Sequence, residues 1–161
     1  MKHAFLFLLV PIVFACGSKN HDANIATVKQ YVKAVENLDY AVMEDLLADN
    51  YQGYGPSVGD TIGKIAAVES WKESVDDLYE KIEYQRSQYA GVTIPEGPNK
   101  GDWVATWAEL KIDYKDGSVV TIWANSNYLV ENDKIAKSLT FYNEADVLEQ
   151  LGYVFINPND L

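Results

Sequence analysis

The sequence predicts one α+β domain in which helices pack on one face of a curled antiparallel sheet. Apolar residues recur at three- and four-residue spacing over residues 25–82, which is typical of amphipathic helices. From residue 84 to residue 142 the pattern changes to the period of two that is typical of strands. The 161 residues, 48% hydrophobic and 23% charged, have the composition of a single globular domain.

Three helices are expected before the strands. Asn24 can cap the first and Asp39 the second, and either Asp60 or Thr61 opens the third. The glycine-rich segment 51–59, between the second and third helices, predicts a short strand and a loop. The apolar stripes of the three helices are Ile25, Val28, Val32, Val35 and Leu38; Val42, Met43, Leu46 and Leu47; and Ile65, Val68, Trp71, Val75, Leu78 and Ile82.

Four strands and one last helix are expected after residue 83. The strands are rich in valine, isoleucine, threonine and aromatic residues, and they span residues 84–94, 102–115, 118–131 and 134–142. Asp116-Gly117 and Asn132-Asp133 have the composition of two-residue hairpin turns, and a longer loop covers residues 95–101. Asn143 can cap the last helix, which Gly152 ends.

Two-residue turns would fix which residues lie opposite each other. A turn at Asp116-Gly117 places Ala108 opposite Asn125, and a turn at Asn132-Asp133 places Asn125 opposite Thr140. The sheet face that contains these residues carries no charged side chain. We expect it beneath the helices, because a buried unpaired charge strongly destabilises a fold.

Polar, uncharged side chains cluster on this expected inner face. Either they surround a cavity that holds water or a ligand, or they satisfy one another or lie near the open edge of the sheet. The first alternative predicts a site for a small apolar or aromatic molecule, with flat aromatic walls and a few orienting hydrogen bonds. The predicted ligand-binding residues are Tyr54, Trp71, Thr106, Trp123, Asn125, Thr140 and Tyr142.

Large apolar side chains alternate with charged ones on the opposite face. An apolar patch of this kind usually marks a protein interface, and a homodimer joined sheet to sheet would cover it. The alternative is that the C-terminal segment 153–156 folds back over the patch. The predicted interface residues are Trp103, Trp107, Tyr128, Leu139 and Phe141.

Charge and rare residues exclude several classes of function. Thirteen basic residues against 24 acidic ones give a formal charge of −11, which disfavours nucleic acid and anionic membrane surfaces as partners. The single cysteine, Cys16, excludes an internal disulfide and a multi-cysteine zinc site. His3 and His21 both precede the expected domain, so catalysis through a histidine is not expected there. We expect no metal site and no cofactor.

The first sixteen residues indicate where in the cell the protein is located. Lys2 precedes an uncharged apolar run over residues 4–15, which has the length of a signal-peptide core and is too short to span a membrane. The run ends in a segment that resembles the lipobox of bacterial lipoproteins, in which Cys16 becomes the lipidated first residue. Residues 1–15 are thus predicted to be a signal peptide, 16–23 the lipidated cysteine and a tether, and 24–161 the domain. The predicted location is extracytoplasmic, with a lipid anchor as the only membrane contact.

The order of elements resembles the nuclear transport factor 2-like (NTF2-like) superfamily, which includes the SnoaL-like domains. The resemblance covers residues 24–153 and depends on the segment 134–143 and on the ending Leu148-Glu-Gln-Leu-Gly152. It implies a cone-shaped sheet around an interior pocket, and in many members a dimer through the outer sheet face. Enzymes of the superfamily, such as ketosteroid isomerase, scytalone dehydratase and limonene epoxide hydrolase, transfer protons with a carboxylate or histidine in the cone. Where relatives often carry Tyr-Asp, this chain has Tyr142-Asn143.

Three functions remain open from sequence. The first is a membrane-tethered binding domain for a small molecule. The second is an isomerase, dehydratase or cyclase, for which Asp49, Asp60 or Glu69 would supply the base and Tyr54 or Tyr142 the proton donor. The third is an interaction module that acts through its outer sheet face. The sequence does not identify catalytic residues.

Overall fold

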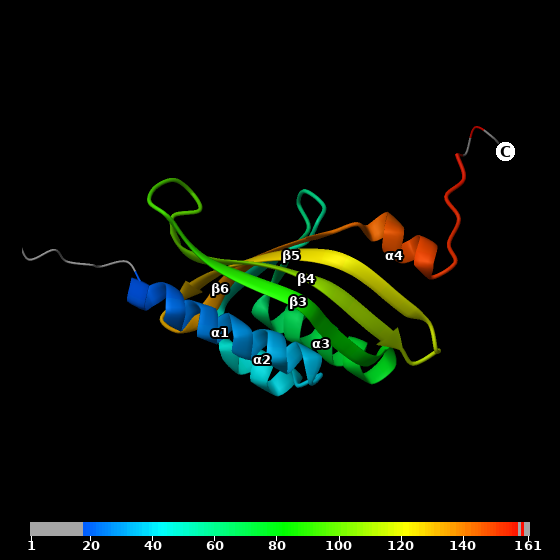
Figure 1. Ribbon diagram of the computed structural model, residues 1–161, viewed down its shortest axis with the longest axis horizontal. Helices are drawn as coiled ribbons and strands as arrows, with labels where there is room; N and C mark the ends of the chain where they lie inside the picture. The colour runs from blue at the N-terminus through cyan, green and yellow to red at the C-terminus, as the bar shows by residue number, and fades with distance from the viewer. Residues whose placement is uncertain (1–17, 158, 160–161) are drawn as a thin grey trace, which may run out of the picture.

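The computed structural model describes residues 18–157 and residue 159. A curled sheet of six strands bends over three helices, and a fourth helix lies at one end of the sheet (Figure 1). No helix within these residues is both long enough and apolar enough to cross a membrane. In chain order the elements are α1 (Ser18–Glu36), α2 (Tyr40–Leu46), β1 (Leu47–Tyr54), β2 (Thr61–Gly63), α3 (Lys64–Asp77), β3 (Tyr79–Ile94), β4 (Gly101–Tyr114), β5 (Val119–Glu131), β6 (Lys134–Tyr142) and α4 (Glu144–Gln150).

Helix α1 begins at Ser18, so the residues predicted as a tether from 18 to 23 are helical and Asn24 is a buried helical residue, not an N-cap. The extra turn is held against β3. The ring of His21 lies over Gly91, where a Cβ atom would come within 2.6 Å of His21 Cγ, and His21 Nε2 lies 2.9 Å from Thr93 Oγ1. The domain therefore does contain a histidine, although His21 lines none of the cavities described below.

The next two helices differ in how well the sequence predicts them. Asp39 caps α2 as expected, with its Oδ1 accepting a hydrogen bond from Val42 N at 3.1 Å. Helix α3 is shorter than predicted at both ends. Residues 61–63 pair with β1 as strand β2, and Ile82, expected on the helix, is a buried residue of β3. Ile82 continues the helical spacing of the preceding apolar residues, but a buried apolar residue fits the inward face of a strand equally well. In β3 its backbone N–H and C=O groups belong to a strand that pairs with β4.

The sheet is mixed, with the strand order β2-β1-β6-β5-β4-β3. The four long strands β3 to β6 are antiparallel as expected, whereas β1 runs parallel to β6. The best-buried side chains lie between the helices and this sheet and include Val28 and Val35 of α1, Met43 of α2, Val104 of β4 and Ile135 of β6. The expectation that uncharged β4 positions face the helices is confirmed by the burial of Val104, Thr106, Ala108 and Ile112.

The turn between β4 and β5 has one residue more than predicted. Tyr114 N donates to Ser118 O at 2.9 Å, so the loop comprises residues 115–117, and Gly117 takes the left-handed φ of 89° that closes a three-residue hairpin loop. Asp116 accepts two hydrogen bonds from Ser118, which stabilises this form of the turn. As a result Ala108 lies opposite Ala124, not Asn125.

The turn between β5 and β6 has the predicted length, but a bulge interrupts the pairing beyond it. Asn132 and Asp133 have φ values of 52° and 60°, as a two-residue turn requires, and Glu131 pairs with Lys134. Between Val130 and Leu129 the register then shifts by one residue, so Asn125 lies opposite Phe141 and not opposite Thr140. A β-bulge leaves one residue without a partner and reverses the facing of the residues beyond it.

These two departures correct the predicted faces of β5 and that of Ala136 on β6, while the predicted faces of β4 hold. Ala136 is the residue that the bulge leaves without a partner, and it packs with Trp103 and Leu129 instead of facing the helices. The even-numbered residues of β5 face the helices, and Trp123 and Asn125 lie on the outer face. Trp123 is 59% exposed. A shift of one residue moves every side chain of a strand to the other face, because the side-chain period is two.

Candidate functional site: a tyrosine-lined cavity

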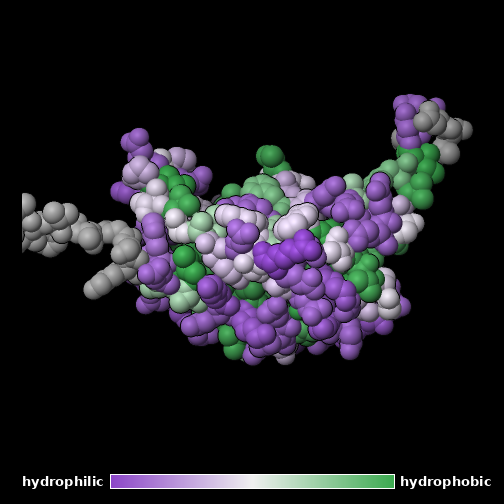
Figure 2. Space-filling model, in the orientation of Figure 1, coloured by the Kyte–Doolittle hydropathy of each residue, from purple (hydrophilic) through white to green (hydrophobic). Residues whose placement is uncertain are grey.

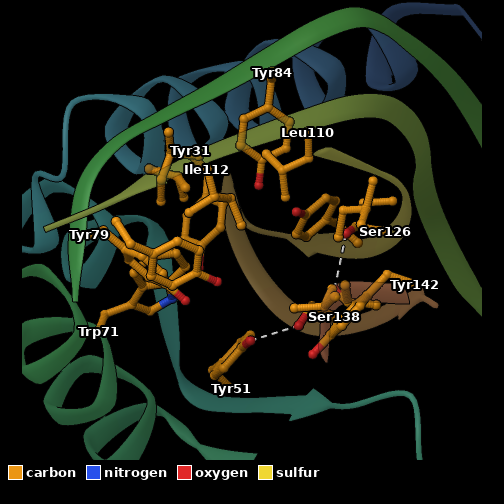
Figure 3. A pocket seen from close by; sticks show the side chains of 18 residues that line it. Tyr31, Tyr51, Trp71, Tyr79, Tyr84, Leu110, Ile112, Ser126, Ser138 and Tyr142 are labelled. Carbon is orange, nitrogen blue, oxygen red and sulfur yellow. Dashed lines mark hydrogen bonds between the residues drawn. The ribbon is translucent and has the colours of Figure 1, made fainter. Parts of the chain in front are cut away.

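A cavity of about 280 Å³ lies between the inner face of the sheet and helices α1 and α3 (Figure 3). Strands β1 and β3 to β6, together with α4, also contribute to its wall. Its size is near the lower end of the range of small-molecule sites. The lining residues are Tyr31, Val35, Tyr51, Trp71, Tyr79, Ile82, Tyr84, Leu110, Ile112, Tyr114, Ile122, Ala124, Ser126, Tyr128, Ser138, Thr140, Tyr142 and Val147.

Strand and helix geometry explains why these side chains converge. The residues from β4, β5 and β6 are all even-numbered, so they share the face of the sheet that bends over the helices. Tyr31 and Val35 are four residues apart and therefore lie on one side of α1. Trp71 reaches in from α3, and Val147 of α4 lies at the end of the cavity.

Two hydrogen bonds join pairs of hydroxyl groups within the cavity wall. Tyr51 Oη lies 2.7 Å from Ser138 Oγ, and Ser126 Oγ lies 3.0 Å from Thr140 Oγ1 (Figure 3). In both pairs either oxygen can be the donor. Each pair joins two strands through side chains, so the polar atoms that the sequence places on the inner face satisfy one another in part.

The aromatic rings form edge-to-face and tilted contacts. The ring centroids of Tyr79 and Tyr114 are 5.6 Å apart at 61°, and those of Trp71 and Tyr79 are 6.0 Å apart at 55°. Tyr31 and Tyr128 meet at 5.9 Å and 61°. Such geometries favour the ring quadrupoles and hold the side chains rigidly, so the walls of the cavity are preformed.

Four lining tyrosines have hydroxyl groups that make no hydrogen bond with another residue in the described part of the chain: Tyr79, Tyr84, Tyr114 and Tyr142. A phenol both donates and accepts a hydrogen bond. The cavity therefore offers several hydrogen-bonding groups to whatever occupies it, on walls that are otherwise aromatic and aliphatic.

All seven lining tyrosines stay neutral at physiological pH. Burial raises the pKa of Tyr128 to about 12 and holds the pKa values of Tyr31 and Tyr84 well above the usual range. Burial is also the main cause of the raised pKa of Tyr142, to which the carboxylates of Glu144 and Asp60 add. These hydroxyls can thus act as hydrogen-bond donors but not as phenolate bases.

None of the described side chains that line the cavity is charged or carries an imidazole. Asp49, Asp60 and Glu69, the candidate bases, are all exposed. Asp60 lies with Tyr54 in a shallow pocket of its own, which shares only Tyr51 and Ser138 with the cavity. The hydrogen bond between Tyr51 and Ser138 therefore lies between Asp60 and the interior.

Comparison with known proteins identifies the fold. No protein-family model and no curated protein matches the sequence. A candidate polyketide cyclase from Xanthomonas campestris pv. campestris superposes with a TM-score of 0.69 at 15% identity over 83% of this chain and 99% of its own. An LEH-like epoxide hydrolase from M. tuberculosis gives 0.63 at 15% identity over 82% and 91%, and an NTF2-like protein of unknown function from Burkholderia pseudomallei gives 0.60 at 14% over 81% and 98%.

The chain has an NTF2-like fold. The expected cone of sheet and helices is thereby confirmed. At 14 to 17% identity the likeness extends to the fold and not to the chemistry.

Within the NTF2-like cone, three of the predicted ligand-binding residues line the cavity: Trp71, Thr140 and Tyr142. Thr106 is buried near the cavity but donates its hydroxyl to Ser126 O at 2.9 Å. Tyr54 lies in the shallow pocket beside Asp60. The prediction that Trp123 and Asn125 line the cavity is wrong, because the longer turn and the bulge place both on the outer face.

Sequence reasoning missed most of the tyrosines that line the NTF2-like cavity. The predicted ligand-binding residues include only Tyr142 of the seven and omit Tyr31, Tyr51, Tyr79, Tyr84, Tyr114 and Tyr128. Tyr128 is predicted on the outer face, and the longer turn after β4 brings it to the inner one. Tyr114, Tyr128 and Tyr142 have the same parity on neighbouring strands, but equal parity places them on one face only with the three-residue loop at 115–117. Seven of the eleven tyrosines of the chain line this one cavity.

On the outer face of the NTF2-like sheet, Trp107 of β4, Trp123 of β5 and Phe141 of β6 are exposed. Asn125 lies between Trp107 and Phe141, and Trp123 is two residues away on the same strand. Trp103 is also on this face but is buried with Leu129 and Ala136, and Leu139 packs against them. The C-terminal segment does not fold back over these residues. It leads away from α4, and Tyr153, Val154, Phe155 and Ile156 are all exposed.

Proposed function

We propose that this protein binds a small, uncharged molecule that carries an aromatic ring and hydrogen-bonding oxygen atoms. One observation supports the proposal above all: the cavity of about 280 Å³ has seven tyrosines in its wall and no charged side chain among its described lining residues. Aromatic walls bind flat apolar surface, and free phenol hydroxyls orient polar atoms. An anion or cation would lose its hydration without gaining a partner.

The second candidate function, proton-transfer catalysis, has less support. A general base must lie within hydrogen-bond reach of the proton that it removes. Asp49, Asp60 and Glu69 are exposed, and the raised pKa of Tyr142 keeps that hydroxyl protonated. Asp60 is the carboxylate to test, because it adds to the raised pKa of Tyr142 from outside the cavity.

A pair of fluorescent probes tests the binding proposal. N-phenyl-1-naphthylamine is uncharged, and 8-anilinonaphthalene-1-sulfonate is the same framework with one added sulfonate. In detergent-free buffer we expect the uncharged probe to bind saturably and the sulfonate to bind at least about tenfold more weakly, a difference of about 1.4 kcal/mol. Equal or tighter binding of the sulfonate would contradict the proposal.

A cavity-filling variant shows whether the probe occupies the cavity. Ala124 lines it, so Ala124→Phe should fill the space and abolish probe binding. Val119→Phe adds the same ring at a solvent-exposed position of the same strand and should leave binding unchanged. If Ala124→Phe folds, by circular dichroism, and still binds the probe with the affinity of the wild type, the cavity is not the binding site.

We also propose that the protein is exported and lipid-anchored through Cys16. The support is the sequence alone, since residues 1–17 lie outside the part of the chain that the structure describes. Helix α1 begins at Ser18, so a lipid on Cys16 would hold α1 close to the membrane surface. Two acyl chains anchor a protein stably, at about 0.8 kcal/mol per buried methylene.

Metabolic labelling with a palmitate analogue tests this anchor. The wild type should incorporate the label and fractionate with membranes, and Cys16→Ser should lose the label. Ser18→Cys in the Cys16→Ser background moves the thiol by two residues and should not restore labelling. Labelling of the Cys16→Ser variant at the level of the wild type would show that Cys16 is not the acylated residue.

The outer sheet face is proposed to join two copies of the chain. Trp107, Trp123 and Phe141 expose aromatic surface that water solvates poorly. Glu109, opposite Trp123, forms an ion pair with Arg86 at 3.1 Å, as at the polar rim of an interface. Light scattering should give the mass of a dimer for the wild type and of a monomer for Phe141→Glu. A wild-type monomer would contradict the proposed interface.

A further inference from the structure

The C-terminal segment after α4, residues 153–157, lacks contacts that would explain its composition. Tyr153, Val154, Phe155 and Ile156 are aromatic or β-branched, yet each is exposed, Val154 by 80%. No helix or strand includes them. In Figure 2 their apolar surface stands clear of the body of the molecule. Four consecutive apolar side chains in water favour a partner surface that the single chain does not supply.

The outer sheet face has an apolar groove that no described residue fills. It has a volume of about 190 Å³ and is lined by Val92, Ile94, Asn99, Trp103, Ala105, Asn127 and Leu139. The wall is rigid, because Trp103 Nε1 donates to Asn99 O at 2.8 Å and thereby ties the loop after β3 to β4. The amide of Asn127 and that of Asn99 offer polar atoms to a peptide backbone.

The groove is continuous with the exposed aromatic residues of the proposed dimer face. Ala105, Asn127 and Leu139 lie opposite one another across β4, β5 and β6, and Trp107, Asn125 and Phe141 form the next row of the same face. The sheet-to-sheet interface and the groove therefore belong to a single surface.

The segment and the groove lie at opposite ends of the molecule. In Figure 1 the chain leaves α4 at one end and projects to the side of the sheet that faces away from α1 to α3, and the loop between β3 and β4 lies at the other end. A two-fold axis parallel to the sheet and perpendicular to the long axis exchanges the two ends. The C-terminal segment of one copy then faces the groove of the other, and five extended residues span about 17 Å.

We propose that residues 153–157 of each copy dock in the outer-face groove of a second copy, so that a homodimer exchanges its C-terminal segments. This inference rests on the proposed dimer face and adds a reciprocal contact to it. The occupant is apolar and extended, as the groove requires, and a two-fold dimer fills both grooves.

Cross-linking of paired cysteines in cells that express the full chain tests the exchange. In a Cys16→Ser background, Phe155→Cys together with Val92→Cys places one thiol on the segment and one at the groove. A short bis-maleimide should convert this variant to a covalent dimer. The control pair Phe155→Cys with Val58→Cys uses a fully exposed loop position away from the groove and should stay monomeric on denaturing gels. Equal cross-linking of the two pairs, or none of the first, would overturn the exchange.

Light scattering separates failure of the exchange from failure of the dimer face. Val154→Asp should weaken dimerisation at least about tenfold, because it would bury a carboxylate in an apolar groove. Val58→Asp, the same substitution at a fully exposed position, should have no effect. If Phe141→Glu gives monomers and Val154→Asp stays dimeric, the sheet interface stands and the exchange is refuted. A monomeric wild type refutes both.

Discussion

A tyrosine inside the cavity is harder to ionise than one in the unfolded chain, and this difference makes stability depend on pH. Burial raises the pKa of Tyr128 from 10.0 to about 12. Between these two values the folded chain keeps a proton that the unfolded chain releases. The free energy of unfolding therefore falls as pH rises through this interval, and below it the stability from this residue is fully present.

We therefore expect Tyr128→Phe to reduce the alkaline loss of stability. Urea unfolding at several pH values between about 9 and 11.5 should give a slope shallower by up to one proton. Tyr153→Phe, at an exposed residue of the C-terminal segment, should leave the slope unchanged. A slope for Tyr128→Phe equal to that of the wild type would show that Tyr128 does not titrate in the way its burial implies.

The hydrogen bond between Tyr51 and Ser138 should contribute measurably to the free energy of unfolding. Its 2.7 Å contact is buried, so Tyr51→Phe leaves the Ser138 hydroxyl without this partner, and we expect a loss of about 1 to 3 kcal/mol of stability. Adding Ser138→Ala should cost little more, since the orphaned group is then gone. Denaturant unfolding of the four variants of this cycle gives the coupling energy. Additive losses would mean that the two hydroxyls do not interact.

At the scale of elements, α4 is weakly held to the rest of the domain. It contains no buried residue, and Val147 is its contribution to the cavity wall. Gln150 ties it to the sheet, with Oε1 accepting from Thr121 N at 2.8 Å and Nε2 donating to Thr121 O at 3.0 Å. The side chain thus occupies the place of a neighbouring strand, next to where β6 has ended.

Loss of this clamp should loosen the helix without unfolding the domain. We expect Gln150→Ala to speed hydrogen exchange of the α4 amides by about tenfold or more, which corresponds to the loss of about 1.4 kcal/mol of local stability. Glu149→Ala, in the same helix but without a side-chain hydrogen bond in the described structure, is the control. Equal exchange in the two variants would mean that other contacts hold α4.

Periodicity and capping chemistry sufficed to predict most elements but not the site. The strands β3 to β6, the Asp39 cap and the Asn143 cap follow from local patterns, and the structure contains them. The start of α1 depends on packing of His21 over Gly91, and the pairing of β1 with β6 joins residues far apart in sequence. The cavity lining depends on register. The turn after β4 is one residue longer than predicted and reverses the faces of β5, and the bulge at Ala136 shifts the register of β6.

At the scale of the whole molecule, charge opposes compactness. The chain carries a formal charge of −11, and the ion pairs of the described residues are mostly exposed, such as Lys33 with Glu36 and Lys134 with Asp45. Exposed pairs contribute little, typically about 0 to 1 kcal/mol. Repulsion among the excess carboxylates should therefore outweigh what the pairs gain.

Added salt should consequently stabilise the protein. We expect the unfolding temperature to rise between about 10 mM and 200 mM sodium chloride, because screening lengths fall to the spacing of surface charges in this range. Differential scanning calorimetry at pH 7 measures it, and potassium chloride at the same ionic strength should give the same rise. A fall in unfolding temperature would show that attractive pairs dominate.

The loop of residues 115–117 has a consequence for how this protein can change over generations. Its three residues set the register of β5 against β4, and hence whether the even-numbered or the odd-numbered side chains of β5 face the interior. Gaining or losing a single residue there would turn Tyr128 outward and bring Trp123 inward, whereas a length change of two would restore the original facing. Descendants of this chain should therefore tolerate insertions at this tip in even numbers far more readily than in odd ones.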